Sequence, residues 1–269
     1  MKKRTLPIFL LVLIFVMSVS VFTACNPDNE NSSGGGLPEG ITVGAGDNIF
    51  TEDATLEQLS VALENADSLT IERGYGGTMW ENGVSYDAEI VMLSCIDRID
   101  KILWRRNSEY SSDVASSAFV YESYCFPDNN MNYFVSFANY RDIEQEDGSY
   151  ITEFNNDGQM TFDTAEKSDT PFEEYEYVSN DEWQTIISML VMKDGKLALT
   201  DDEYAYVGSE VTNRKLDLNG TTMTISYTVN DYDEEGNVNG NYYYYFTIKG
   251  VNGTKINISE EIKSYCKQA

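Results

Sequence analysis

The chain has 269 residues, a formal net charge of −27 and no histidine. Such a charge argues against nucleic acid and anionic lipid headgroups as partners, because both are negatively charged. The lack of histidine removes His metal sites and the Ser-His and Cys-His nucleophile pairs. We therefore expect a protein that is not an enzyme and has no cofactor or metal site. An enzyme would need a cleft with two coupled carboxylates or a metal.

Residues 1–24 have the features of a secretory signal peptide. A basic start at residues 2–4 precedes an apolar run over residues 8–22. This run is shorter than the roughly 20 residues that a membrane-spanning helix needs, and it ends in small residues. We expect export and removal of this segment; a single-span anchor is the alternative.

The end of that run, Phe22-Thr23-Ala24-Cys25, resembles the lipobox of bacterial lipoproteins. The resemblance implies that the signal is cut before Cys25 and that Cys25 carries a diacylglycerol, a stable membrane anchor. Asn26–Gly40 is polar and rich in Gly and Ser, which is typical of a flexible tether. We expect the lipidated cysteine and tether to span residues 25–48 and to hold the protein at the extracytoplasmic membrane surface of a Gram-positive cell. In the alternative, Cys25 is incidental.

The first element of the folded part is predicted to be an amphipathic helix over Asp53–Asp67. Asp53 is a residue type that caps helix starts, and one face carries apolar residues at helical spacing. These apolar residues are Leu56, Leu59, Leu63 and Ala66.

Antiparallel strands are predicted for most of the remaining chain. Asx-Gly pairs between alternating runs can supply the positive-φ residues of type I′ hairpin turns. Five such pairs indicate a meander: Asn82-Gly83, Asp147-Gly148, Asp157-Gly158, Asn219-Gly220 and Asn252-Gly253. In the clearest strand, Thr222–Val229, apolar and polar residues alternate, and a turn at Asn219-Gly220 places Leu216 opposite Met223.

One basic cluster interrupts the acidic sequence. It consists of Arg98, Lys101, Arg105 and Arg106. These residues could bind an anionic headgroup or a carboxylate; the alternative is a solvated face that pairs with local acids.

A second helix is predicted to begin at a capping box formed by Ser179 and Glu182. Its apolar stripe contains Trp183, Ile186, Ile187, Leu190 and Val191, and it stops at Asp194-Gly195. A short third helix is predicted to begin at Ser259.

The run NGNYYYYFTIKG over residues 239–250 reads as a strand. Because strand side chains alternate between faces, Tyr242, Tyr244, Phe246 and Ile248 should point inward, and Tyr243 and Tyr245 outward. The preceding loop, Asn230–Asn237, begins like a calcium loop, but position twelve is Tyr242 and not glutamate. We read it as an exposed hairpin loop.

Cys95, Cys125 and Cys266 match no metal motif. One disulfide with a free thiol and three buried thiols fit these positions equally well.

The order of these elements predicts an α+β fold: a curved antiparallel sheet, or half-barrel, with two or three helices packed on its concave face. Residues 49–269 would form a single domain. The lipobox and tether, the first helix leading through residues 66–70 into strands, and INISEEIK at 256–263 resemble LolA/LppX-like half-barrel lipoproteins of bacteria. That resemblance implies an open sheet closed by helices, with lipid or acyl chains carried between them.

We therefore expect a membrane-anchored extracytoplasmic lipoprotein that binds or carries a hydrophobic or lipid ligand. The alternative is a non-catalytic cell-surface interaction or scaffold protein with a filled core, whose partner is a cell-envelope protein. The expected ligand contacts lie on the inward strand faces and the second helix: Tyr227, Tyr242, Tyr244, Phe246, Trp183 and Ile187.

Overall fold

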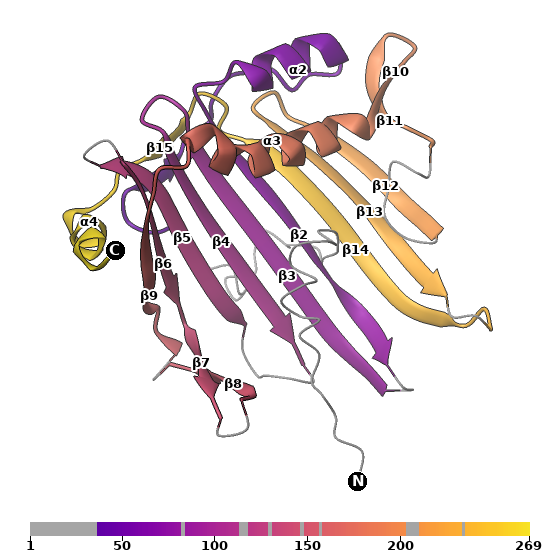
Figure 1. The fold of residues 1–269 in the computed structure, drawn as a ribbon. Helices are drawn as coiled ribbons and strands as arrows, with labels where there is room; N and C mark the ends of the chain where they lie inside the picture. Colours follow the sequence, from indigo (N-terminus) through magenta and orange to yellow (C-terminus); the bar gives the residue numbers. More distant parts are fainter. Residues whose placement is uncertain are drawn as a thin grey trace.

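The computed structural model describes residues 37–81, 84–112, 118–128, 131–145, 148–155, 158–202, 210–232 and 235–269. Its main element is one nine-stranded antiparallel sheet (Figure 1). From one edge to the other, the strands are β12 (Glu210–Leu218), β13 (Thr222–Tyr232), β14 (Val238–Lys249), β2 (Ser68–Glu81), β3 (Val84–Asp97), β4 (Ile102–Ser111), β5 (Phe119–Asp128), β6 (Met131–Ala138) and β9 (Thr161–Ser168). The prediction of a mostly antiparallel sheet with few helices is confirmed, and the sheet is not closed.

Two meanders that are distant in sequence join at the pairing of β14 with β2. Tyr242, Tyr243 and Tyr245 lie opposite Gly77, Gly76 and Gly74. A Cβ atom on Gly77 would lie 2.2 Å from the Asn241 carbonyl oxygen, and one on Gly74 would lie 3.1 Å from the Tyr245 ring. The glycines therefore make room for the run of tyrosines.

The β12–β13 register differs from the expected one. Leu216 pairs with Ile225 and Leu218 pairs with Met223, so Leu216 does not face Met223. The turn is longer because Gly220 pairs with Phe50, and the Thr222 amide donates to Asn219 Oδ1 at 2.8 Å. The slip from Met223 to Ile225 is an even number of residues, so the apolar faces stay aligned.

The three helices are α2 (Leu56–Glu64), α3 (Phe172–Ser188) and α4 (Glu260–Tyr265), with a short 3-10 turn η3 (Cys266–Gln268) after α4. The cap of α2 is Thr55, in a capping box with Gln58, and not Asp53. Ser259 caps α4, as predicted; its Oγ accepts from the Ile262 amide at 3.2 Å.

The start and end of α3 were both predicted incorrectly. The helix begins after Pro171, and Ser179 lies in its interior. Pro171 is the N-cap residue, and Glu173 and Glu174 in the first turn interact favourably with the helix dipole. After Ser188 the chain forms a hairpin of β10 (Leu190–Lys193) and β11 (Lys196–Leu199). Asp194 and Gly195 have φ of 53° and 79°, so this pair makes a hairpin turn.

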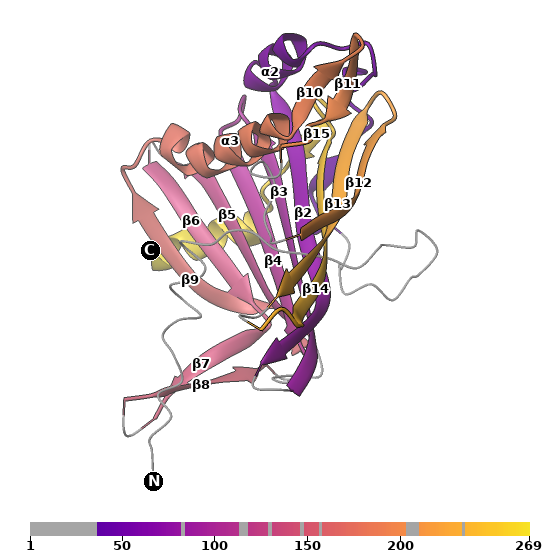
Figure 2. The same cartoon turned by 90° about the vertical axis from the view of Figure 1, so that its right-hand side faces the viewer.

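The two faces of the sheet carry separate cores. On the side we call the helix face, α3 crosses one end of the strands (Figures 1 and 2). Its core includes residues of α2, α3 and the strands, among them Leu59, Leu63, Ile186, Ile225 and Ile248.

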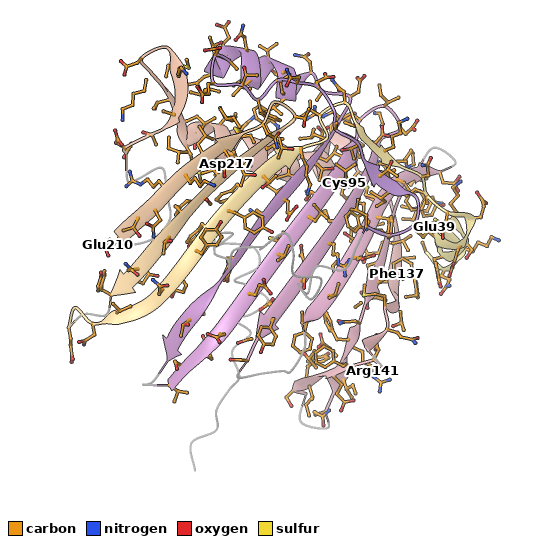
Figure 3. The ribbon with its side chains drawn as sticks, turned by 180° about the vertical axis from the view of Figure 1, so that it is seen from behind. Glu39, Cys95, Phe137, Arg141, Glu210 and Asp217 are labelled. Carbon is orange, nitrogen blue, oxygen red and sulfur yellow. The ribbon has the colours of Figure 1, made fainter. Side chains whose placement is uncertain are left out.

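The opposite side, the back face, is covered near the same end by three short elements. These are β1 (Ile41–Val43), β15 (Thr254–Ile256) and α4. They pack against Cys95, Trp104, Tyr124 and Val135, and Figure 3 shows this side with Cys95 and Phe137 labelled. The third helix therefore lies on the face opposite α3, because the chain crosses the sheet after β14.

β1 lies inside the range expected for the tether. It pairs with β15, and Ile41 is buried, so the folded part begins before residue 49. Cys25 and residues 26–36 lie outside the described residues, as does the signal peptide. No helix in the described part of the chain is both long and apolar enough to cross a membrane.

A separate hairpin of β7 (Tyr140–Glu144) and β8 (Tyr150–Phe154) projects from the end of the sheet far from α3 (Figure 2). At its base, the rings of Tyr140 and Phe154 contact the ring of Phe119. The Phe119 and Phe154 rings stack with centroids 4.5 Å apart.

Cys95, Cys125 and Cys266 are all free thiols. Cys95 belongs to the back-face core and Cys125 to the helix-face core, so the sheet separates them. Burial raises the pKa of Cys95 to about 11 and that of Cys125 to about 12.

We expect a thiol reagent at pH 8 to modify Cys266, which is partly exposed, while Cys95 and Cys125 react only after unfolding. Their burial blocks the reagent, and their raised pKa values keep them protonated. Peptide mapping by mass spectrometry before and after denaturant measures this order. Equal labelling of all three in the native protein would contradict it.

Candidate ligand-binding face

The six predicted contact residues come together on the helix face. Tyr227, Tyr244, Phe246 and Trp183 belong to its buried core, and Tyr242 and Ile187 pack against that core. The Tyr227 and Tyr244 rings stack with centroids 4.5 Å apart and planes 8° apart. The prediction that these strand residues point inward is confirmed by the register of Tyr227 with Tyr244 and of Ile225 with Phe246.

The region beneath α3 is largely filled by the protein itself. Trp183, Tyr227, Tyr244 and Phe246 are only 6%, 0%, 4% and 8% exposed. Tyr242 and Ile187 are half-buried and keep some free surface. Of the expected contacts, these two are therefore the ones that an added molecule could touch without rearrangement.

One row of side chains continues from this core across the sheet. In successive strands from β13 to β5, Tyr227, Tyr244, Tyr75, Ile90, Glu109 and Phe119 lie opposite one another. We call these six residues the cross-strand row. Because neighbouring strands are about 4.8 Å apart, its five intervals span roughly 24 Å.

Exposure increases along the cross-strand row. Tyr227 and Tyr244 are buried, whereas Tyr75, Ile90, Glu109 and Phe119 are half-buried. Similar half-buried residues of β2, β3 and β5 lie on the same face: Met79, Tyr86, Met92 and Tyr121. The strands extend well past α3 in Figure 2, so the helix covers only part of this face.

Ion pairs attach α3 to the sheet. Arg73 Nη2 lies 3.2 Å from Glu182 Oε1, and Lys101 Nζ lies 2.8 Å from Glu173 Oε1. Arg98 pairs with Glu176 through its Nε. Burial lowers the pKa of Arg105, and Glu182 opposes this shift.

The basic cluster is therefore not one anion-binding patch. Arg98 and Lys101 pair with α3, and Arg106 lies 3.5 Å from Glu122 on the back face. By the register of β4, Arg105 points to the helix face and Arg106 to the back face. For Arg98, Lys101 and Arg106, the structure agrees with the alternative of pairing with local acids.

Burial raises the pKa values of three acidic groups on or beside the helix face: Glu109, Tyr140 and Tyr242. Burial raises the pKa of the Glu109 carboxyl above its usual 4.5. Burial is the first cause that raises the pKa of Tyr140 to about 12; the charges of Asp142, Asp163 and Glu109 also contribute. The pKa of Tyr242 is raised to about 12, first by burial and then by the charge of Asp231.

We expect Glu109→Gln to increase stability at pH 7 by about 1 kcal/mol, the scale of a poorly solvated polar group. The folded pKa of Glu109 is raised, so the folded state holds the proton more tightly than the unfolded chain. The stability contributed by this carboxyl is therefore full below its ordinary pKa and is lost as pH rises through the folded value. The gain should vanish below pH 4.

Urea unfolding at pH 7 and pH 4 measures this difference. Glu89→Gln removes the same charge from the back face of β3 and is the matched control. A Glu109→Gln gain that is equal at both pH values would contradict the assignment.

Among the described residues, no group of three or more His, Cys, Asp and Glu side chains could hold a metal ion. The calcium-like loop falls at the β13–β14 turn, where Asp233 and Glu234 lie outside the described residues.

On the back face, a cavity of about 240 Å³ lies beside α4, lined by residues that include Ile102, Phe126, Ile256 and Lys263.

Comparison with protein-family models, curated proteins and solved structures gave no match for this chain. The fold and the helix face define it as a protein with one large open antiparallel sheet, one end of which is crossed by a helix held by ion pairs.

The sequence patterns predicted two members of the cross-strand row, Tyr227 and Tyr244. They did not predict the other four: Tyr75, Ile90, Glu109 and Phe119. The alternation of Tyr86, Ala88, Ile90 and Met92 in β3 was a readable signal for one strand. Their alignment with Tyr244 depends on the long-range pairing of β14 with β2, which no local pattern specifies.

Proposed function

We propose that the protein is a membrane-anchored extracytoplasmic lipoprotein that binds or carries a hydrophobic ligand on the helix face of its sheet. The cross-strand row is the observation that carries this proposal. It offers a half-buried aromatic and aliphatic surface next to α3, on the side where Tyr242 and Ile187 keep free surface. An elongated apolar ligand would lie across the strands along the row.

The shape of the sheet supports the finer part of this proposal, a half-barrel with helices on its concave side. In Figure 2 the sheet bends around the side that carries α3. An open sheet crossed by a helix is also the arrangement implied by the resemblance to LolA/LppX-like lipoproteins. Two helices, α2 and α3, contribute to the core of this side.

The energy of such binding comes from apolar surface removed from water. At about 25 cal/mol per Å², covering roughly 200 Å² of apolar surface contributes about 5 kcal/mol before the cost of ordering the ligand. That is enough for weak, reversible binding, as a carrier requires.

The test compares two substitutions on neighbouring residues of β3 that point to opposite faces. Ile90→Asn lies in the cross-strand row, and Val91→Asn lies on the back face. With the full chain in nanodiscs of zwitterionic lipid, we expect a fluorescent apolar probe to bind the wild type. Ile90→Asn should weaken this binding about tenfold, or ~1.4 kcal/mol, and Val91→Asn should leave it unchanged.

Two results would overturn the proposal. One is no probe binding above that of empty discs, together with no lipid extracted from the purified protein. The other is an equal loss in both variants, which would indicate a general loss of structure or binding outside the row.

The filled region beneath α3 supports a second candidate, a non-catalytic cell-surface interaction or scaffold protein. Four of the six expected contacts are enclosed by the protein's own side chains, as a structural core requires. The same titration separates the candidates, because a scaffold with a filled core should bind neither probe nor lipid.

Membrane attachment through Cys25 has its own test. We expect Cys25→Ala to abolish incorporation of a labelled fatty acid and to leave the signal segment uncut at this position. Intact-mass measurement after membrane fractionation reads out both. Fatty-acid labelling that persists in the variant would refute lipidation at Cys25.

A further inference from the structure

The outer end of the cross-strand row is acidic and aromatic. Glu109 lies directly opposite Phe119, and the Phe119 and Tyr140 rings meet edge to face with centroids 5.4 Å apart. Tyr121 follows Phe119 by two residues and so points to the same face, where Ser136 donates to Asp163 at 3.0 Å. We call Glu109, Phe119, Tyr121, Tyr140 and Asp163 the acidic aromatic patch.

The charged groups that act on the tyrosines of this patch are acidic, and the nearby Arg141 is paired with Glu153 of β8. Among the described residues, no cation pairs with Glu109. The charged groups that act on Tyr121 are Asp163 and Glu166, and those that act on Tyr140 are Asp142, Asp163 and Glu109, apart from a tyrosine neighbour. By contrast, Arg73, farther along the same face, is paired with Glu182 of α3.

We infer that the acidic aromatic patch binds the positively charged end of an amphiphilic ligand, an amine or quaternary ammonium group joined to an apolar body. This inference rests on the proposed function, because the apolar body would lie along the cross-strand row. A carboxylate attracts a cation directly, and the rings of Tyr121 and Tyr140 add cation–π attraction. The ring of Phe119 is stacked on Phe154, so it supports the patch rather than contacting the cation. The overall charge of −27 raises the local concentration of cations around the protein.

A ligand with an anionic end is disfavoured at the same place. Its charge would meet Glu109 and Asp163 at a half-buried position, where like charges repel more strongly than in water. A neutral ligand would gain the apolar contacts of the row but nothing from the carboxylates. The three kinds of ligand are therefore distinguishable by affinity.

The experiment titrates the full chain in nanodiscs with three probes that share an octyl chain: a trimethylammonium, a sulfate and a neutral glucoside, each below its micelle-forming concentration. Partition into empty discs is subtracted. We expect the ammonium probe to bind at least tenfold more tightly than the sulfate. Glu109→Gln should lose about tenfold of the ammonium affinity and keep the glucoside affinity.

Glu89→Gln is the matched control, because it removes the same charge from the other face of the sheet. Any general attraction of cations to the acidic protein changes equally in both variants. The control should keep the wild-type preference for ammonium over sulfate.

Equal binding of ammonium and sulfate, or an ammonium preference that survives Glu109→Gln, would overturn the inference. If the glucoside still binds in that case, the proposed function stands and only the ligand class is wrong. If none of the three probes binds, both the proposed function and this inference fail.

Discussion

Replacing Arg98 with alanine is expected to lower the free energy of unfolding by about 3 kcal/mol, the scale for breaking a buried ion pair. Arg98 is the residue that ties both helices of the helix-face core to the sheet. Its Nη1 donates to the carbonyl oxygens of Leu63 at 2.8 Å and Ala66 at 2.7 Å, at the end of α2. Its Nε pairs with Glu176 of α3.

The loss would leave the Glu176 carboxylate, only 11% exposed, without this partner, and it would uncap carbonyl groups after α2. Lys101→Ala is the matched control on the same turn, because the side chains of Lys101 and Glu173 are 52% and 62% exposed. An exposed pair contributes below ~1 kcal/mol. Urea unfolding followed by far-UV circular dichroism measures both; equal effects would show that Arg98 does not connect the helices as described.

Trp183→Ala is expected to cost about 3 to 5 kcal/mol, the range for truncating a buried aromatic residue. Trp183 is 6% exposed and packs in the same core as Ile186, Tyr227 and Phe246. Removing the indole leaves a void between α3 and the sheet that close-packed neighbours can fill only in part.

Gln184→Ala, on the exposed side of the same helix, should change stability by less than ~0.5 kcal/mol. Thermal and urea unfolding give the two values. The Trp183 result also bears on function: a small loss, with apolar probe binding gained beneath α3, would show that this region opens easily and is not a filled core.

Local patterns predicted the strand faces better than the helix ends. Alternation alone placed Tyr242, Tyr244, Phe246 and Ile248 on the apolar side of β14, opposite the apolar residues of β13. The period of a strand is short, so a few residues define its face. Helix ends depend on competing signals: α3 begins after Pro171 and not at the capping box of Ser179, and Phe172 in its first turn is buried.

The candidate site was only partly readable because it combines strands from both ends of the sequence. Trp183 and Tyr227 could be named from local apolar patterns. Glu109 could not, since in sequence it is one of 45 acidic residues. Its significance comes from lying opposite Ile90 and Phe119, a result of long-range pairing.

The pairing of β14 with β2 also sets the order in which the protein can be completed. β2 is the first strand of the nine-stranded sheet in sequence and β14 is the last, yet they are neighbours in the sheet. As the chain is synthesised, the strands from β2 to β6 can pair with one another early. The other edge of β2 stays unpaired until β14, which contains Tyr242–Tyr245, has been made. Such a late, long-range closure is slow and leaves a strand edge exposed until it occurs. The segment Tyr242–Tyr245 of β14 therefore pairs the β12–β14 strands with the β2–β9 strands. A chain that stops before residue 238 would lack β14 and this pairing.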